Sequence, residues 1–326
     1  MCGHVGCGIV AGMALGVGER LTTRVEPSQA ARRRWPRMSS VVPYVLVAPA
    51  TLYMLALLGY PFFLALYFSV SNASVQESVT QFVGLQNYAN VIGDAQFQKA
   101  LLNSFIFTFG SGIVKGILGT ALAFLLLRHF PARKIIRGFL MLPWTLPIAL
   151  SVLAFKFGMF DPQFSVVNWL GAHLGIIHSP YPNWLGDPIF AMIAVMAVNV
   201  WRGFPFTAII VLAGLTSVPP EILDAAKVDG ANWERRWHAI IVPMIAPILF
   251  VGLTFDVVFT FTDLSVVYLL TNGGPINATE ILPTLAFRVG IVGGDLARGS
   301  AIALFMLPLL VLMVVLMLRA LRRRDI

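Results

Sequence analysis

"PPEILDAAKVDGANWERRWHAIIVPMIAP", residues 219–247, is the longest stretch of mixed charge between two apolar blocks of the chain. Its first half has the pattern of a short helix. Pro220 suits a first helical turn, where its missing N–H would have no partner, and Glu221 and Asp224 lie where the positive helix end favours acidic side chains. Gly230 is the predicted stop. The stretch therefore begins with a helix that ends in a turn.

The second half of the stretch predicts another short helix. Asn232 can cap this helix by accepting a hydrogen bond from a backbone N–H. We expect Pro243 to limit how far the helix continues before the next apolar block. The loop of about residues 216–243 thus has an ordered helix-turn-helix shape of its own.

The composition around this loop is that of a membrane protein. Of 326 residues, 58% are hydrophobic and 12% charged, with a mean hydropathy of +0.81. An ordinary soluble domain has about 25% charged residues, and a helix needs about 20 apolar residues to cross a bilayer. Six apolar runs reach this length: Val41–Val70, Leu102–Leu127, Ile135–Phe160, Ile189–Leu215, Met244–Leu270 and Ser300–Leu318. The fold class predicted is an all-α polytopic membrane protein with six transmembrane helices.

The distribution of basic residues predicts how the helices are oriented. Short loops rich in Lys and Arg stay in the cytoplasm. The amino-terminal segment, the loop after the second run, the 219–247 stretch and the tail hold 17 of the 23 basic residues, and the other connections hold only Lys99, Arg288 and Arg298. Both termini and the 219–247 stretch are therefore expected to be cytoplasmic. The net charge of +8 follows from this topology and does not indicate a nucleic-acid partner.

Three segments are expected along the chain. Residues 1–40 form a cytoplasmic amino-terminal extension that we predict to be disordered; their basic residues follow the apolar stretch, which argues against a secretory signal. Residues 41–318 form the transmembrane domain, and residues 319–326 a basic cytoplasmic tail. The only cysteines, Cys2 and Cys7, lie in the extension, so no disulfide framework is implied.

The sequence lacks the motifs of common catalytic sites. It contains no G-x-x-x-x-G-K-[ST] phosphate loop, no H-E-x-x-H and no G-x-S-x-G. His129, His173, His178 and His238 have no metal-ligand spacing, so no metal site is expected. We therefore predict that the chain is not an enzyme and binds no cofactor itself.

Ionisable side chains inside apolar runs are costly and are functional candidates. Lys115, Arg202 and Asp256 each lie about halfway along a run, so we expect Asp256 to pair with one of the two cations. Such a pair can fix the register of two helices, or the charges can line a polar translocation cavity, which Asn199 and Asp263 would join. Both interpretations stay open from the sequence.

Small residues and loop composition carry weaker signals. The second run contains glycines at helical spacing, which permit close helix packing in lipid; we favour packing within one subunit over a dedicated dimer face. The loops 161–188 and 271–299 are rich in Gly, Pro, Asn and Trp. They suit docking surfaces or ordered lids.

The 219–247 stretch resembles the cytoplasmic "EAA" signature of permease subunits in binding-protein-dependent ABC importers. The matching residues are Asp224-Ala225-Ala226, Asp229-Gly230-Ala231 and Ile240-Ile241-Val242-Pro243. Further segments resemble the carbohydrate, maltose-permease-like branch of that family: "LPWTLP" at 142–147, "NWLG" at 183–186, "VWRGFPF" at 200–206, "LAGLTSVPPEIL" at 212–223 and "YLLTNGGP" at 268–275. The resemblance covers about residues 40–320.

The resemblance implies a function for the loop. In the family it forms coupling helices that insert into a cleft of a separate ATPase subunit. The residues carried over to this role are Glu221, Asp224, Ala225, Ala226, Asp229, Gly230, Ala231, Trp237 and Pro243. Two depart from the signature: Asp224 stands where Glu is usual, which shortens the reach of the charge, and Trp237 where Phe is usual, which keeps an apolar plug.

The resemblance also implies an assembly in the bacterial cytoplasmic membrane. It would contain this subunit, a second related permease, two ABC ATPase subunits that bind ATP and Mg, and an external solute-binding protein. The expected substrate is a sugar, oligosaccharide, polyol or glycerol-phosphate type solute. Specificity would lie largely with the binding protein.

Two other classes compete with this interpretation. An ion-coupled secondary transporter would use Lys115, Arg202 and Asp256 as coupling groups, and a structural membrane scaffold would use none of them. Vanadate-sensitive uptake, or co-purification with an ATPase, separates the importer from both.

Overall fold

The computed structural model describes residues 42–76, 80–128 and 133–322. The predicted amino-terminal extension, residues 1–40, and the last four residues of the tail lie outside the described residues. The chain divides into two units, Met1–Ala56 and Leu57–Ile326. In the first, the described residues form helix α1 and the start of a π-helical turn; the second contains every other element discussed below.

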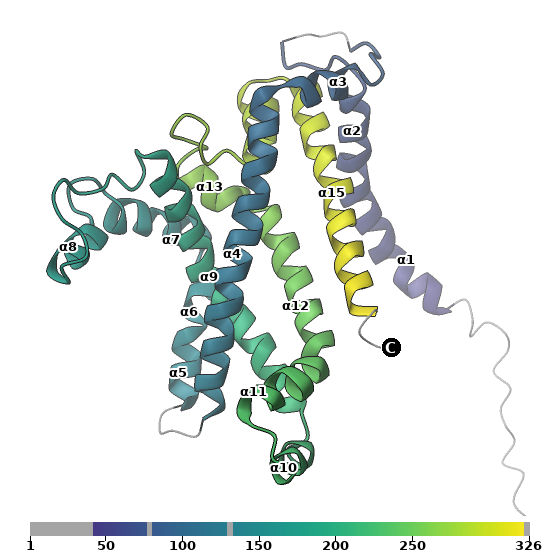
Figure 1. Ribbon diagram of the computed structural model, residues 1–326. Helices are drawn as coiled ribbons and strands as arrows, with labels where there is room; N and C mark the ends of the chain where they lie inside the picture. Colours follow the sequence, from purple (N-terminus) through teal and green to yellow (C-terminus); the bar gives the residue numbers. More distant parts are fainter. Residues whose placement is uncertain (1–41, 77–79, 129–132, 323–326) are drawn as a thin grey trace, which may run out of the picture. The chain divides into compact units, whose positions relative to one another are not determined.

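The described residues form helices and loops, with one isolated antiparallel bridge between Ser71 and Phe82. This confirms the all-α fold class (Figure 1). In chain order the elements are α1 (Val42–Met54), η2 (Leu55–Gly59), α2 (Tyr60–Ser69), α3 (Gln86–Gly93), α4 (Ala95–Leu127), α5 (Arg133–Leu140), α6 (Leu142–Thr145), α7 (Ile148–Ala154), η3 (Phe155–Met159), α8 (Val166–His173), α9 (Pro188–Ser217), α10 (Pro220–Val228), α11 (Trp233–Arg236), η4 (Trp237–Ile241), α12 (Val242–Phe261), α13 (Leu264–Leu270), α14 (Leu282–Phe287), η5 (Arg288–Val292) and α15 (Leu296–Arg322), where η marks a π-helical turn.

Five helical stretches of the described chain are long and apolar enough to cross a membrane. They are Val42–Ser69, Ala95–Leu127, Pro188–Ser217, Trp233–Phe261 and Leu296–Arg319. A sixth is possible if the bent pair Ile135–Thr145 and Ile148–Met159 counts as one span. Five of the six predicted runs thus contain a membrane-crossing helix and the third contains the bent pair, with two differences in how the runs are built.

The third run is not one straight helix, as we had expected for Ile135–Phe160. Its two halves meet at an angle of 93°. Pro147 explains the break, because a proline disfavours helical geometry at the residue before it. Leu146 accordingly is extended, with ψ at 142°, and α7 starts afresh at the residue after the proline.

The fifth run was also predicted too long, as Met244–Leu270. The helix ends at Phe261, and a second helix, α13, begins at Leu264. Asp263 causes the change, since its carboxylate accepts hydrogen bonds from the backbone N–H groups of Ser265 at 3.1 Å and Val266 at 3.2 Å. A side chain that caps a new helix N-terminus competes with continuation of the old helix.

Helix α4 is the element that the others share. Three apolar clusters of buried side chains lie along it: one with α3, α12, α14 and α15, one with α7, α9 and α13, and one with α9, η4 and α12. Each cluster contains residues of α4, from Phe97 and Ala100 through Phe107 to Ala123. The helix therefore connects both ends of the second unit.

Helices α4 and α9 pack side by side through glycine. A Cβ on Gly119 would come within 3.0 Å of the backbone N of Ala208 and within 2.9 Å of the Thr207 side chain. Gly116, one turn earlier, has nothing within 4 Å of such a Cβ. For Gly119 the expected packing within one subunit is confirmed, whereas Gly116 is not needed for it.

This difference predicts opposite effects of one substitution at the two glycines. Gly119→Ala should destabilise the protein by about 1–3 kcal/mol, because the new methyl group overpacks the α4–α9 contact. Gly116→Ala should be neutral or stabilising by up to about 1 kcal/mol, because alanine favours helix over glycine. Thermal unfolding of the purified variants in mild detergent measures both. Equal shifts in the two variants would contradict the close approach at Gly119.

Candidate functional site

The first helix of the 219–247 stretch is closed as the sequence predicts. Gly230 has a positive φ of 75°. Behind it, Ala231 N donates to Ala226 O at 2.9 Å and Gly230 N donates to Lys227 O at 3.1 Å. These two bonds form the Schellman pattern that satisfies the last carbonyls of a helix. The turn after α10 is therefore specified by its own backbone.

The second helix starts as expected but does not stop. The Asn232 side chain accepts from Arg235 N at 2.8 Å, which confirms the predicted cap. The helix then runs without interruption from Trp233 to Phe261, whereas we expected Pro243 to limit it. In the π-helical turn η4 the N–H of Val242 reaches five residues back to Trp237 O, and the wider turn accommodates the proline. The loop is thus continuous with a membrane-crossing helix.

The outward face of the loop is acidic and small. Glu221, Asp224, Ala225 and Asp229 are all exposed. Asp224 Oδ1 accepts from the Lys227 ammonium at 2.6 Å, with both side chains more than half exposed. A surface pair of this kind contributes at most about 1 kcal/mol, so Asp224 can exchange this partner for another at little cost.

Two of the loop residues carried over from the resemblance turn inward. Ala226 is 7% exposed, so packing inside this chain explains its small size. The ring centroid of Trp237 lies 5.0 Å from that of Phe124 on α4. This contact packs the loop against α4. The most exposed large apolar residues of the stretch are Val228 and Trp233, which the sequence did not single out.

The midplane carboxylate pairs with one of the two predicted cations. Lys115 Nζ on α4 donates to Asp256 Oδ1 on α12 at 2.5 Å and to Thr260 Oγ1 at 2.7 Å. Lys115 is 2% exposed and Asp256 9%. A Cβ on Gly203 of α9 would lie only 2.6 Å from Lys115 Cδ, so the glycine leaves room for the lysine. The prediction of a pair is confirmed, and its cation is Lys115.

Arg202 has a different environment. Its guanidinium lies 5.7 Å from the ring centroid of Trp144, which in turn stacks on Phe206 at 4.8 Å. Arg202 Nε is buried without a hydrogen-bond partner among the described residues. Asn199 Nδ2 donates to Asp263 Oδ2 at 3.0 Å. Hydrogen bonds and ring contacts therefore join the candidate residues as Lys115 with Asp256, Asn199 with Asp263, and Arg202 with Trp144.

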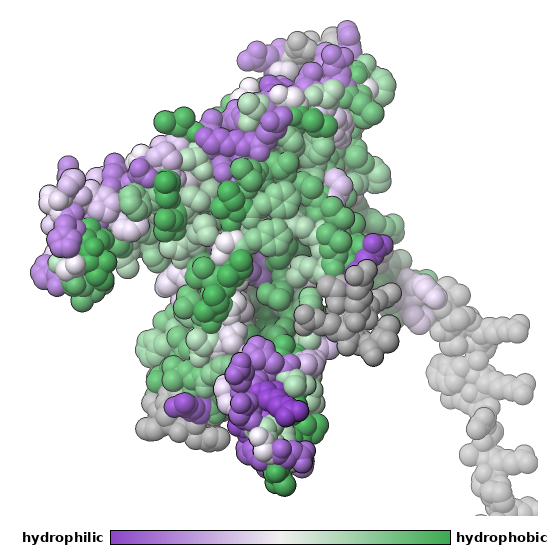
Figure 2. All heavy atoms as spheres, in the orientation of Figure 1, coloured by the Kyte–Doolittle hydropathy of each residue, from purple (hydrophilic) through white to green (hydrophobic). Residues whose placement is uncertain are grey.

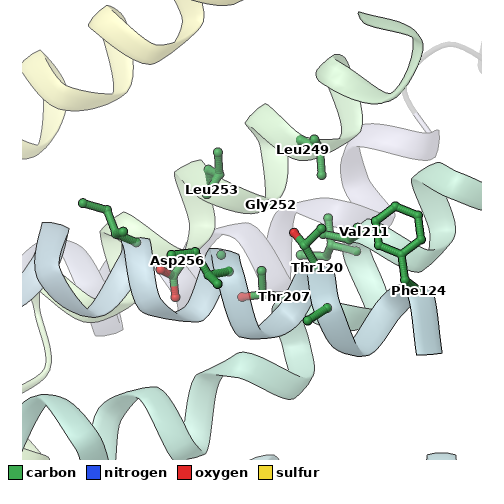
Figure 3. Close-up of a pocket in the computed structure, with 13 residues that line it drawn as sticks. Thr120, Phe124, Thr207, Val211, Leu249, Gly252, Leu253 and Asp256 are labelled. Carbon is green, nitrogen blue, oxygen red and sulfur yellow. The ribbon is translucent and has the colours of Figure 1, made fainter. Parts of the chain in front are cut away.

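A cavity of about 600 Å³ opens beside Asp256, between α4, α9 and α12. Figure 3 labels Thr120, Phe124, Thr207, Val211, Leu249, Gly252, Leu253 and Asp256 in its wall. A polar cavity was one of the two interpretations left open by the sequence, but apart from Asp256 and two threonines the lining is apolar. A role of the five residues in translocation stays a prediction.

Among the described residues, no group of three or more His, Cys, Asp or Glu side chains is arranged to hold a metal.

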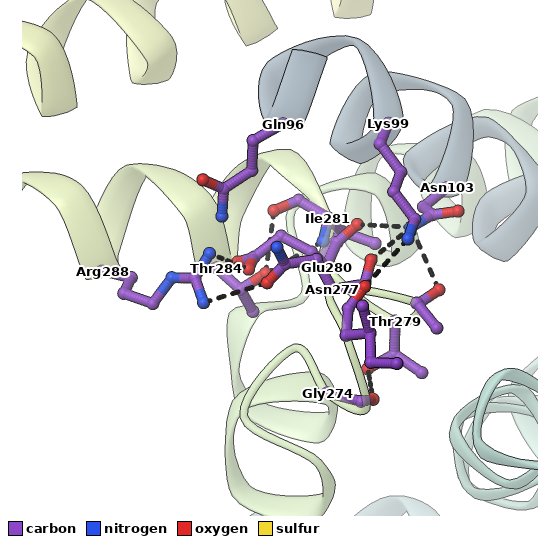
Figure 4. Close-up of polar contacts among 12 residues, drawn as sticks. Gln96, Lys99, Asn103, Gly274, Asn277, Thr279, Glu280, Ile281, Thr284 and Arg288 are labelled. Carbon is purple, nitrogen blue, oxygen red and sulfur yellow. Dashed lines mark hydrogen bonds and ion pairs between the residues drawn. The ribbon is translucent and has the colours of Figure 1, made fainter. Parts of the chain in front are cut away.

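A second polar cluster holds the 271–281 loop on the amino-terminal part of α4 (Figure 4). Asn103 Nδ2 donates to the backbone oxygens of Asn277, Ala278 and Glu280 at 3.3, 3.0 and 3.0 Å. The Glu280 carboxylate is fully buried and forms an ion pair with Arg288.

Sequence reasoning missed this cluster as a candidate site. Lys99 also contributes to it, donating to Ile276 O at 2.9 Å. The available signals were an asparagine early in an apolar run and a lone glutamate beside the "TNGGP" segment. Neither signal identifies its partner, because the contacts join residues more than 170 positions apart.

Arg137 and Arg298 lie at opposite ends of α4. Arg137 reaches the carbonyl of Leu126 at the carboxyl end of α4, near the 219–247 stretch (Figure 1). Arg298 pairs with Asp94 at 2.8 Å, at the amino end of the same helix. These features define a multi-pass, all-helical membrane protein with buried charge between its spans and an ordered loop at one end.

Comparison with known proteins gives the family. Residues 115–325 match the model of the family described as "binding-protein-dependent transport system inner membrane component". The chain belongs to this family, and it is therefore an ABC transporter permease.

Two relatives and one solved structure illustrate the likeness. The trehalose/maltose transport system permease protein MalF of Thermococcus litoralis is 33% identical over 75% of this chain and 81% of its own length. The diacetylchitobiose uptake system permease protein DasB of Streptomyces coelicolor is 29% identical over 84% of each chain. A chain of the bacterial alginate ABC transporter, solved with an alginate pentasaccharide-bound periplasmic protein, has a TM-score of 0.74 over 89% of this chain and 98% of its own, at 20% identity. This last match shows the shared fold.

The ion pair between Lys115 and Asp256 predicts that substitutions of these two residues have non-additive effects on stability. Asp256→Ala should destabilise the protein by about 3–5 kcal/mol, because Lys115 is left buried without its counter-charge. Combining Asp256→Ala with Lys115→Met should restore most of that stability, as measured by thermal unfolding in detergent.

Arg298 supplies the control for this double mutant. It pairs with Asp94 at the amino end of α4, away from Lys115 and Asp256, so Arg298→Met combined with Asp256→Ala should give the sum of the two single effects. If the Lys115 combination were equally additive, the pairing would contribute nothing to stability.

The conformation of Gly230 predicts which substitutions this position tolerates. The positive φ of the backbone alone decides the outcome. A Cβ there meets nothing within 4 Å, so Gly230→Val should cost about 1–2 kcal/mol through its positive φ only. Gly230→Asn should cost less, because asparagine adopts this conformation more readily. Hydrogen exchange of the α10 amides should speed up in the valine variant while the spans stay protected. Identical exchange in the two variants would refute this account.

Proposed function

We propose that this chain is the membrane-spanning subunit of an ATP-driven importer of a sugar or related polar solute, coupled to separate ATPase subunits through residues 219–243. The observation that carries the proposal is the continuity of Trp233–Phe261. One uninterrupted helix joins the exposed loop to Asp256, so a force applied to the loop reaches the midplane without crossing a flexible connection.

The loop is attached to the spans at further points. The Trp237 ring packs against Phe124 of α4. Ile241 and Ile245 share an apolar cluster with Val211 and Leu215 of α9. A partner that displaces the loop would therefore act on α4, α9 and α12 together.

The exposed face of the loop has the chemistry of a docking surface for an ATPase cleft. Acidic side chains stand beside the exposed Val228, and Trp233 is 55% exposed. Aromatic anchors are typical of the centre of protein interfaces, and polar groups are typical of their rim. We assign Glu221, Asp224, Ala225, Asp229 and Trp233 to this contact. ATP and Mg would be bound by the two ATPase subunits.

The remaining partners follow from the family. Its name specifies dependence on a binding protein, and we infer an external solute-binding protein and a second, related permease subunit beside this one. The assembly would lie in the bacterial cytoplasmic membrane, with the 219–243 loop on the cytoplasmic side, as the distribution of Lys and Arg predicts.

The substrate class is inferred from the relatives and from the midplane. MalF and DasB carry names that specify trehalose or maltose and diacetylchitobiose, respectively. Between the spans of this chain, Arg202 lies against Trp144, and Asn199 pairs with Asp263. Aromatic rings with nearby polar groups suit a sugar or polyol. We propose these residues, with Lys115 and Asp256, as the translocation path.

A second candidate function rests on the buried Lys115–Asp256 pair, which an ion-coupled carrier would use as its coupling group. Uptake in vesicles separates the two functions. Transport by the proposed importer should be abolished by vanadate and by removal of ATP, and it should persist when ion gradients are collapsed. The reverse pattern would overturn the importer.

The docking face predicts different consequences at two adjacent alanines. Ala225→Leu should abolish co-purification of the ATPase while membrane abundance stays normal, because Ala225 is exposed and a larger side chain would overlap the partner. Ala225→Ser should keep the association. If helix propensity alone mattered, serine would be the more damaging change, since leucine is the better helix former.

Ala226 is the matched control. Ala226→Leu should lower the stability of the loop itself, because Ala226 is buried within this chain. Normal ATPase association in both Ala225 variants would remove this residue from the interface.

A further inference from the structure

The segment between η3 and α9, residues 162–186, forms a small lobe around α8, here called the α8 lobe. It contains no Lys, Arg, Asp or Glu, and its ionisable side chains are His173, His178 and Tyr181. The carboxylates on either side are occupied as caps. Asp161 accepts from the backbone N–H groups of Gln163 and Phe164, and Asp187 accepts from those of the first turn of α9.

Polar side chains order the inside of the α8 lobe. Ser165 is 5% exposed; its hydroxyl donates to Met159 O at 2.6 Å and accepts from Asn168 N at 3.1 Å. Asn168 is 7% exposed, donates to Pro182 O at 3.2 Å and accepts from Trp184 Nε1 at 2.8 Å. The lobe is therefore a built structure with its hydrogen bonds satisfied internally.

Apolar side chains cover the outside of the same lobe. Large hydrophobic residues are exposed by half or more: Phe164 at 78%, Trp169 at 61%, Leu170 at 50%, Leu174 at 63%, Ile176 at 72% and Tyr181 at 54%. Buried polar groups and exposed apolar groups reverse the arrangement expected of a loop in water. Figure 2 shows hydrophobic surface on the lower edge of this part of the molecule, as drawn.

The position of the lobe along the spans matches this surface. The α8 lobe follows η3 and leads directly into α9, a membrane-crossing helix that starts at Pro188. It therefore lies at the end of a span, opposite the end that carries the 219–247 stretch (Figure 1). Trp and Tyr are enriched at this level in membrane proteins, where their rings lie among lipid headgroups.

We propose that the α8 lobe is an interfacial membrane anchor, with Phe164, Trp169, Leu174 and Ile176 inserted among the lipids of the outer leaflet. A protein partner would be expected to meet a surface with charged side chains at its rim, whereas the 25 residues of this lobe include no Lys, Arg, Asp or Glu, and the polar groups on its surface are uncharged side chains and histidines such as Gln163, Asn183 and His178. Lipid contact accounts for both the missing charge and the exposed aromatic side chains. The inference goes beyond the proposed function, and only the choice of the outer leaflet rests on the orientation proposed there.

Site-directed spin labelling of the full-length chain tests the proposal. Cys2 and Cys7 are replaced by serine, and a single cysteine is introduced at Leu174 or Ile176, which are exposed and so tolerate the label. The protein is placed in nanodiscs of phosphatidylethanolamine and phosphatidylglycerol. Collision rates of the nitroxide are then measured with oxygen, which concentrates in lipid, and with a water-soluble nickel chelate.

Ile276→Cys is the matched control. Ile276 is an isoleucine that is 84% exposed, but it lies on the 271–281 loop beside Asn277 and Lys99. The ratio of oxygen to nickel collisions at positions 174 and 176 should exceed that at 276 by about threefold or more, as for a site about 5–10 Å into the interface.

Each other outcome overturns the proposal. A ratio at positions 174 and 176 equal to that at 276 would place the α8 lobe in water. Shielding from both reagents would show that another protein surface covers the lobe, and a shift to such shielding on addition of the external binding protein would identify that partner instead. Because the readout involves no transport, failure here leaves the proposed function untouched.

Discussion

The contact between Lys115 and Asp256 constrains the rest of the second unit. Two charges of opposite sign, buried at the depth of the spans, must meet within hydrogen-bond distance, since either one alone would be costly in the membrane. This sets the register of α4 against α12. The lysine also needs the space beside Gly203, which sets α9 against both. The apolar clusters along α4 can then be filled by side chains of ordinary size, because the three helices already have a fixed spacing.

The same helix α4 has a polar or aromatic attachment at each end. Asn103 holds the 271–281 loop near its beginning, and Phe124 contacts Trp237 of the opposite loop near its end. Lys115 lies between them. A displacement of either loop is therefore transmitted to α4, whose midpoint is held by the Lys115–Asp256 ion pair. A coupled transporter requires such a connection between its loops and its spans.

Sequence reasoning succeeded where local chemistry decides the structure. Apolar length predicts the spans, and Gly230 and Asn232 predict the turn between α10 and α11, because each acts within a few residues. It failed where one residue is compatible with two different local structures. Pro243 suggested a stop, but a π-helical turn absorbed it, and Asp263 appeared to lie within a span but caps a new helix. The Glu280–Asn103 cluster was out of reach, since its partners are set by tertiary packing.

The free energy needed to break each contact indicates how the spans would move relative to one another. Separating a buried ion pair costs about 3–5 kcal/mol, whereas a helix that has already ended requires no contact to be broken at that point. The described chain has such breaks at Pro147 and at Asp263, both beside the helices that carry the midplane charges. A displacement of the 219–243 loop would thus carry α4, α9 and α12 as one body. The bending would be concentrated at these two breaks, and Arg202 with Trp144 would lie close to the first of them.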